Sequence, residues 1–210
     1  PSEKIELHSS QLEEAGVEMI AVVSGYNEGF YYFLGEGGHP ALQDVAVRQA
    51  IAMATDRFSI TNDLLLGLTE PATTDWHNTG YNNPDLEPYP YDPDAAIALL
   101  EGAGWTDTDD DGVRDDGDGT MLSFTYGTTT REIRMDTQAV FQQNLAEVGI
   151  EVELLNFDSD IFFSSYGEGG PAAKGELDIF EQSSTPAFPD PDSADWLCSE
   201  IPSEEFPDGG

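Results

Sequence analysis

The chain has 210 residues, with 42 acidic and 7 basic side chains, and a formal net charge of -35. This balance argues against nucleic acid or an anionic membrane surface as a partner, because both require a basic patch. Hydrophobic residues still make up 39% of the sequence, which indicates a folded domain rather than an acidic disordered tail. Since molar salt shortens the Debye length to ~3 Å and screens repulsion between carboxylates, we expect a halophilic source, most simply a haloarchaeon. The alternative is an ordinary acidic secreted protein.

The first ninety residues alternate between strand and helix signals before a long loop. Strands are predicted over Val17–Val23 and Phe30–Leu34, and helices over Val45–Thr55 and Ile60–Leu66 with a break near Arg57. Residues 69–91 then hold four prolines and are predicted to form an irregular loop, which is often a functional feature at this length. Trp76 and His77 lie in this loop, where they either pack on the loop itself or form a wall of a ligand cleft.

Residues 91–105 contain the signals for one complete helix. Asp92 is a good N-cap and Pro93 sits at the first helical position, where its missing N–H costs nothing. Gly102 and Gly104 end the helix, and Trp105 is placed to fold back on it. The apolar face of this helix consists of Ala95, Ala96, Leu99 and Leu100.

An acidic loop follows this helix with the spacing of a calcium-binding loop. Counted from Asp107, its acids and one carbonyl fall at positions 1, 3, 5, 7, 9 and 12 of an EF-hand-like pattern. Those candidate ligands are Asp107, Asp109, Asp111, the carbonyl of Val113, Asp115 and Asp118. Position 12 normally carries a glutamate and a helix normally follows, so a solvated acidic turn is the other interpretation. If calcium binds, we expect a structural role, and no cofactor is required.

The second half of the chain predicts a parallel strand–helix–strand unit. Strands are expected over Met121–Gly127 and Ile150–Phe157, joined by a helix over Arg131–Val148 with a right-handed crossover. This helix is amphipathic, with an apolar face made of Ile133, Val140, Phe141, Leu145 and Val148. Leu122, Phe124 and Tyr126 share one face of the first strand, where Tyr126 is either a core residue or a ligand contact. Asp158–Tyr166 is expected to hold a short helix and Leu177–Phe180 a last strand, with loop from Ser183 onward. The fold class is therefore α/β.

Four segments in order resemble the extracellular solute-binding proteins of family 5, the peptide-binding receptors of ABC importers. The helix-and-loop segment at residues 91–118 is similar to the family pattern, which has Y-D-P, then L-L, then A-G-W and then an acidic loop. The other three are HPALQDVAVRQAIAMATDR at His39–Arg57, FQQNLAEVGIEVEL at Phe141–Leu154 and FPDPD at Phe188–Asp192. The resemblance runs from about Gly25 to Asp192.

This resemblance implies one lobe of a type II periplasmic-binding-protein-like fold, a mixed sheet with flanking helices. Residues 1–35 would carry hinge-side strands belonging partly to the other lobe, 36–192 the ligand-binding lobe, and 193–210 a truncated return segment. The implied protein is extracellular and anchored at the cell surface, acts as a monomer, and passes a small solute of the peptide or sugar class to a permease. The expected ligand contacts are Trp76, His77, Tyr126 and Phe188. This piece itself has no segment for membrane insertion.

One departure from the family pattern concerns the substrate. Peptide-binding members carry an aspartate just before the F/Y-P-D-P-D aromatic, where it pairs with the peptide ammonium, and this chain has Ala187 there. Since a buried ammonium without a carboxylate is costly, another acid must substitute if the solute is a peptide. No phosphate loop, zinc-protease motif or nucleophile elbow occurs in the sequence, so we do not expect this chain to be an enzyme. The alternative function is a calcium-dependent cell-surface structural module.

Overall fold

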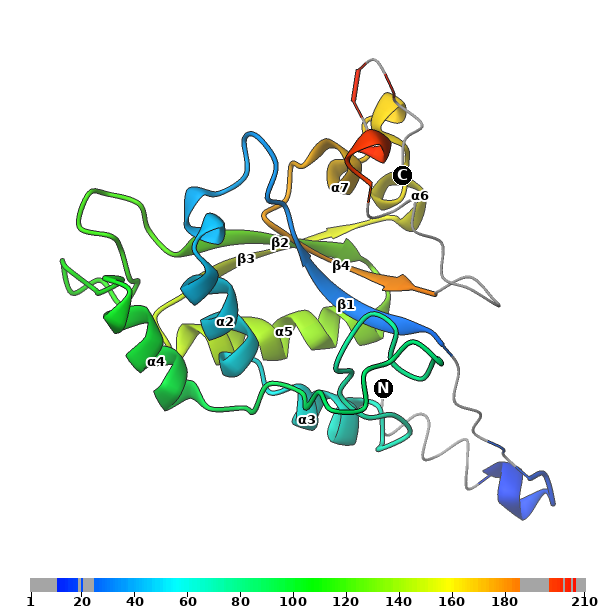
Figure 1. The fold of residues 1–210 in the computed structure, drawn as a ribbon. Helices are drawn as coiled ribbons and strands as arrows, with labels where there is room; N and C mark the ends of the chain where they lie inside the picture. The colour runs from blue at the N-terminus through cyan, green and yellow to red at the C-terminus, as the bar shows by residue number, and fades with distance from the viewer. Residues whose placement is uncertain are drawn as a thin grey trace.

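A four-stranded mixed sheet forms the centre of the molecule in the computed structural model, which describes residues 11–18, 20, 25–185, 197–201, 203, 204 and 206 (Figure 1). The strand order is β1-β4-β2-β3. β1 is antiparallel to β4, and β2 is parallel to both of its neighbours, β4 and β3. The strands are β1 (Asn27–Tyr32), β2 (Ser123–Thr129), β3 (Glu151–Phe157) and β4 (Ile179–Ser184). The predicted α/β class is confirmed.

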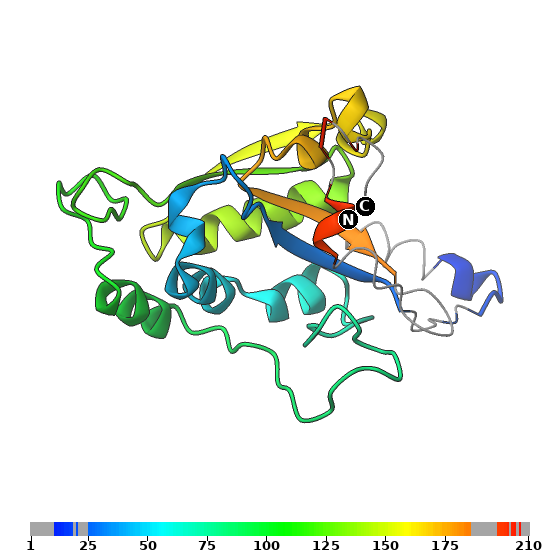
Figure 2. The same ribbon diagram turned by 45° about the horizontal axis from the view of Figure 1, so that its top comes forward.

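The helices lie on both faces of this sheet. One layer, below the sheet in Figure 1, contains α2, α3, α4 and α5, while α6 and α7 lie on the opposite side. Figure 2 shows the same ribbon from a second direction, with the long loop between η2 and α4 extending below the helices. Their bounds are α2 (Val45–Ala54), α3 (Arg57–Ser59), η2 (Ile60–Leu64), α4 (Pro93–Gly102), α5 (Glu132–Ala146), α6 (Ser159–Phe162) and α7 (Pro171–Lys174), with short 3-10 turns η1 (Pro40–Gln43), η3 (Tyr166–Glu168) and η5 (Cys198–Glu200).

Most predicted elements are confirmed, including the parallel strand–helix–strand unit β2–α5–β3. Asp92 caps α4 as expected, because its Oδ1 accepts a 2.9 Å hydrogen bond from the Ala95 N–H. The prediction of loop from Ser183 onward is wrong, since β4 continues to Ser184 through its pairing with β1. The predicted strand Val17–Val23 lies mostly outside the described residues, and residues 17, 18 and 20 form no strand.

One apolar core joins the sheet to α2, α4 and α5. Phe124 and Tyr126 of β2 are almost fully buried against Phe141 and Leu145 of α5. Burial of side chains of this size contributes about 1.5–3 kcal/mol each. Trp105 folds back on the end of α4 as predicted, and its Nε1 donates a 3.0 Å hydrogen bond to Asp44 Oδ2, the N-cap of α2. The core therefore packs α2 against α4, and the long loop lies in the segment between these two helices.

The buried face of α5 departs from the sequence prediction. Ile133 and Val140 are expected on it from the sequence, but both remain partly exposed, whereas Arg134, Thr137 and Gln138 are buried. Gln138 is satisfied because its Nε2 donates to the carbonyls of Tyr126 at 3.0 Å and Leu155 at 3.3 Å. A polar group buried in this way costs little when its hydrogen bonds are met. The N-terminal half of α5 thus places buried polar side chains against the sheet.

Candidate functional site

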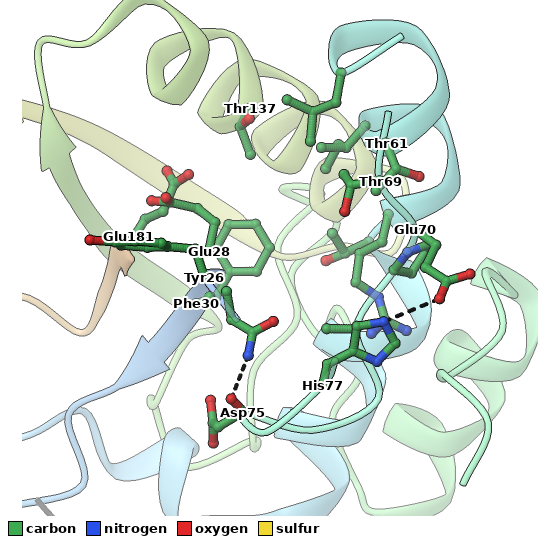
Figure 3. Close-up of a pocket in the computed structure, with 18 of the residues that line it drawn as sticks. Tyr26, Glu28, Phe30, Thr61, Thr69, Glu70, Asp75, His77, Thr137 and Glu181 are labelled. Atoms are coloured by element: carbon green, nitrogen blue, oxygen red, sulfur yellow. Dashed lines mark hydrogen bonds and ion pairs between the residues drawn. The ribbon is translucent and has the colours of Figure 1, made fainter. Parts of the chain in front are cut away.

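A cavity of about 500 Å³ lies between the sheet, α5 and the long loop (Figure 3). Its walls come from β1, α2, the segment after η2, residues 69–78, the start of α5 and Glu181 of β4. This volume is typical of small-molecule sites. Its floor is apolar, since Phe30, Ile51 and Phe141 line it. The cavity is therefore a concave apolar surface with a polar rim, built from segments far apart in the sequence.

Charged side chains concentrate at this cavity. Three of the five arginines in the chain line it, Arg57, Arg131 and Arg134, although basic residues are scarce elsewhere. Acids line it as well, namely Glu28, Glu70, Asp75 and Glu181. Figure 3 shows Glu28 and Glu181 on one side of the cavity and Glu70 with His77 on the other. Such a site can take a solute that carries both positive and negative groups.

An ion-pair network crosses the end of the sheet where β1 and β4 meet α5. Arg134 Nε lies 2.8 Å from Glu28 Oε1, and Arg134 Nη2 donates a 3.0 Å hydrogen bond to Ser183 Oγ. Ser183 Oγ in turn donates to Glu28 Oε2 at 2.6 Å. Arg134 is only 5% exposed, whereas the Glu28 side chain is 39% exposed, so solvent reaches the carboxylate end of this pair. The network holds β1, β4 and α5 in one arrangement.

Glu181 is the most deeply buried acid of the cavity wall. It is 2% exposed, and its Oε2 accepts a 2.7 Å hydrogen bond from Tyr126 Oη. Burial raises the pKa of Glu181 to about 8, and the charge of Glu28 adds to this rise, whereas the Tyr126 hydrogen bond, Arg134 and Arg131 oppose it. Burial and the adjacent Glu181 also raise the pKa of Tyr126, so that phenol stays protonated as the donor.

The loop over residues 69–78 closes one side of the cavity. Asn27 Nδ2 donates a hydrogen bond to the carbonyl of Asp75, which ties the loop to the first residue of β1. His77 is 8% exposed, and its Nε2 lies 3.3 Å from Glu70 Oε1. The loop is thus tied to β1 at Asp75, and the contact between Glu70 and His77 joins two parts of the loop to each other.

The four expected ligand contacts fall in different places. His77 lines the cavity, while Trp76, one residue earlier, is half-buried with its ring 6.3 Å from that of Tyr81. Tyr126 is fully buried in the core behind the cavity wall, where it contacts the lining residue Glu181 through a hydrogen bond. Phe188 and Ala187 lie outside the described residues. Sequence reasoning missed Glu28, Arg134 and Glu181, which the pairing of β1 with β4 and the packing of α5 bring together.

The acidic loop gathers three of its predicted ligands. Carboxylate oxygens of Asp107, Asp109 and Asp111 all lie within 4.8 Å of one another on the surface. Asp115 instead faces its own loop, since Oδ2 accepts hydrogen bonds from the N–H and hydroxyl of Thr108 at 3.1 and 2.8 Å. These bonds lower the pKa of Asp115. For Val113 and Asp118 the described contacts are backbone N–H bonds to Asp111 and Asp116, so the first three acids are the residues that could hold a cation.

The acidic loop is anchored to the fold by one arginine. Arg114 Nε donates to the carbonyl of Val148 at 2.8 Å, and its Nη1 donates to the carbonyl of Trp105 at 3.0 Å. Two helix ends are therefore tied to the loop, because Trp105 follows α4 and Val148 follows α5.

Among the residues that the structure describes, no helix is long and apolar enough to cross a bilayer.

Similarity to known proteins covers nearly the whole chain. Residues 5–199 match the family described as "Bacterial extracellular solute-binding proteins, family 5 Middle". The oligopeptide-binding protein AppA of Bacillus subtilis is 37% identical over 115 residues, which is 53% of this chain and 21% of AppA. The nickel-binding periplasmic protein of Escherichia coli is 27% identical over 128 residues, 60% of this chain and 24% of that protein.

Solved structures agree in fold. An oligopeptide-binding protein from Thermus thermophilus, complexed with a pentapeptide, superposes with a TM-score of 0.72 at 25% identity, over 80% of this chain and 29% of that one. NikA from Brucella suis, in complex with Fe(III)-EDTA, gives a TM-score of 0.61 at 25% identity, over 83% of this chain and 34% of that one. The chain spans about a quarter or less of the length of the curated relatives described above. With its family match over residues 5–199, this chain belongs to the extracellular solute-binding proteins of family 5.

Proposed function

We propose that this chain forms the second lobe of a receptor that captures a small solute between two lobes and delivers it to an ABC-importer permease. The observation that carries this proposal is the cavity, an apolar hollow rimmed by arginines and acids within a chain of this family. Hinge closure around the solute would enclose it without any chemistry on the substrate. The working molecule is a monomer located outside the cytoplasm and anchored at the cell surface.

A peptide is the solute class that we favour. The relative with 37% identity is named an oligopeptide-binding protein, and a structure of the same fold holds a pentapeptide. The cavity rim has cationic and anionic groups for the two termini of a peptide, and its apolar floor suits side chains. Sugars and metal chelates remain alternative outcomes of the test, and catalysis has no part in the proposal.

The direct test is mass spectrometry of small molecules released when the complete protein, purified in molar NaCl, is denatured. Co-purified peptides are the expected result. A released sugar or metal chelate would keep the receptor function and change its solute class. A protein that releases nothing, and that binds no member of a peptide and sugar panel, would contradict the receptor function.

The acidity of the chain supports a halophilic source. With a net charge of -35, repulsion among surface carboxylates destabilises the compact state in dilute buffer and is largely screened in molar salt. We expect the melting temperature to fall as NaCl is lowered from molar to dilute concentration. About 2 M and about 0.1 M NaCl give strong and weak screening of the surface charges. Equal melting temperatures in these two solutions would contradict a halophilic source.

A structural calcium ion at Asp107, Asp109 and Asp111 is a further part of the proposal. Convergence of three exposed carboxylates within 4.8 Å suits a hard divalent cation with oxygen ligands. The cation would stiffen the turn between α4 and β2 and would take no part in solute capture. The corresponding measurement is described with the other predictions below.

A further inference from the structure

Glu181 is a buried carboxyl group that forms no ion pair within the described part of the chain. Its side chain is 2% exposed, lines the cavity, and has one neutral partner, the Tyr126 hydroxyl at 2.7 Å. A charge buried in this way is stable only when an opposite charge accompanies it. Among described residues, no lysine, arginine or histidine nitrogen lies within 4.0 Å of its carboxylate, whereas Glu28 has Arg134.

Neither of the nearby arginines forms an ion pair with Glu181. Arg134 places its Nε on Glu28 at 2.8 Å, its Nη1 on Thr129 Oγ1 at 3.2 Å and its Nη2 on Ser183 Oγ at 3.0 Å. Arg131 precedes α5 as an exposed residue on the cavity rim. The charged and titratable groups that act on Glu181 are therefore Glu28 from β1, Tyr126 from β2, and Arg134 with Arg131 from the start of α5.

Strand pairing places the two glutamates on the same surface. Glu28 pairs with Ser183, and Phe30 pairs with Glu181, so Glu28 and Glu181 are diagonal neighbours across β1 and β4. Diagonal neighbours in antiparallel strands lie close enough for long side chains to act on one group. Both glutamates line the cavity, and both are drawn on the same side of it in Figure 3.

We propose that Glu181, with Glu28 beside it, forms the subsite that receives an ammonium group of the captured solute. This assignment rests on the proposed receptor function and names the chemistry of one end of its ligand. The ammonium would lie over the apolar floor near Phe30, within reach of both carboxylates.

Proton release on binding follows from this assignment. With a pKa near 8 in the empty cavity, Glu181 is mostly protonated at neutral pH, and an ammonium ion beside it favours the carboxylate. The proton then leaves Glu181 for solvent as the ammonium arrives. Binding is thus an exchange of one positive charge for another at the same carboxyl group.

The experiment is equilibrium dialysis of the complete protein, in molar NaCl at pH 7, against a defined pool of alanine peptides. The pool contains tri-, tetra- and penta-alanine, each with a free amine or an N-acetylated amine, and bound peptides are quantified by mass spectrometry. We expect the wild-type protein to retain free-amine peptides over acetylated ones by about 30-fold or more. Glu181→Gln is expected to abolish that preference, because the amide cannot balance the ammonium charge.

A matched control is Glu153→Gln, which removes an exposed glutamate on β3, the strand at the far edge of the sheet. This variant is expected to keep the full preference. The inference is overturned if Glu181→Gln keeps the preference, or if the wild-type protein shows none. If the wild-type protein binds no peptide of the pool, the inference is wrong, and the release of another solute on denaturation decides the receptor function separately.

A second measurement needs no variant, in case Glu181→Gln fails to fold. Titration calorimetry of the wild-type protein with tri-alanine, in two pH 7 buffers of different ionisation enthalpy, counts the protons released. We expect about one proton per peptide, because Glu181 passes from mostly protonated to ionised. A heat that is independent of the buffer would overturn the inference.

Discussion

The cavity wall and the acidic loop both concentrate carboxylates, but they stabilise them in opposite ways. In the loop, Asp107, Asp109 and Asp111 are exposed, and Asp107 accepts hydrogen bonds from the N–H groups of Asp111 and Gly112. In the cavity, Glu28 and Glu181 come from opposite ends of the chain, and Glu181 is almost inaccessible to solvent. In a chain with 42 acids, the surroundings rather than the composition distinguish a solvated carboxylate from a functional one.

Removal of the shared core beneath the cavity has the largest expected effect. Phe141 is fully buried, with ring centroids 4.8 Å from Phe30 and 5.0 Å from Tyr126. Phe141→Ala is expected to lower the free energy of unfolding by about 3–5 kcal/mol, because it leaves a void that the packed rings cannot fill. Urea denaturation in molar NaCl measures this loss. A cost below about 1 kcal/mol would mean that the cavity floor is not part of the core.

The pH dependence of stability separates the two kinds of carboxylate. The folded-state pKa of Glu181, about 8, lies above that of an ordinary glutamate near 4.5, so the folded protein binds more protons between these values. Stability therefore falls as pH rises from about 4.5 to 8, by up to about 1.4 kcal/mol per pH unit from this group. Glu181→Gln should remove this part of the slope, so the variant gains stability relative to the wild-type protein as pH rises.

Denaturation of both proteins at pH 5, 6.5 and 8, as about the start, middle and end of that range, measures the difference. Glu153→Gln is the control, since an exposed carboxylate of β3 should leave the slope unchanged. A constant difference between Glu181→Gln and the wild-type protein across this range would show that Glu181 is not buried as an acid.

Sequence reasoning reaches the acidic loop more easily than the cavity, for a physical reason. The helix α4, its cap Asp92 and the return of Trp105 depend on neighbours within a few residues, and so does the loop spacing. The pairing of β1 with β4 depends on the whole fold, so nothing local indicates that Glu28 and Glu181 meet. Alternation offers one signal, because Glu181 follows the buried Ile179 by two residues on the same strand.

The same contrast applies to α5. The sequence places the apolar residues Phe141 and Leu145 correctly on its buried face, but hydrophobicity alone favours Ile133 over Arg134. Arg134, Gln138, Phe141 and Leu145 recur at helical spacing, so periodicity also indicates the polar half of the buried face. The charge of Arg134 is tolerated only because Glu28 and Ser183 meet it, and those partners belong to distant strands.

Calcium is expected to act on the loop and not on the cavity. If the three clustered aspartates bind the cation, calcium at 100 times its Kd should stabilise the wild-type protein by about 2.7 kcal/mol. Asp109→Asn should remove most of this gain, whereas Asp118→Asn, outside the cluster of three, should keep it. Melting curves with calcium or with chelator give the measurement. Equal gains in both variants would remove Asp109 from the site.

The smallest effect is expected at the exposed edge of the cavity, where the two kinds of carboxylate become comparable. Glu70 Oε1 lies 3.3 Å from His77 Nε2, but the Glu70 side chain is 74% exposed, as solvated as the loop acids. An ion pair with so exposed a partner contributes about 0–1 kcal/mol, so Glu70→Gln should change the free energy of unfolding by about 0.5 kcal/mol or less. Urea denaturation at about pH 5, below the ordinary pKa of a histidine, tests this value beside Glu181→Gln. A loss of several kcal/mol would mean that Glu70 is shielded like Glu181, and that position on the cavity wall matters more than exposure.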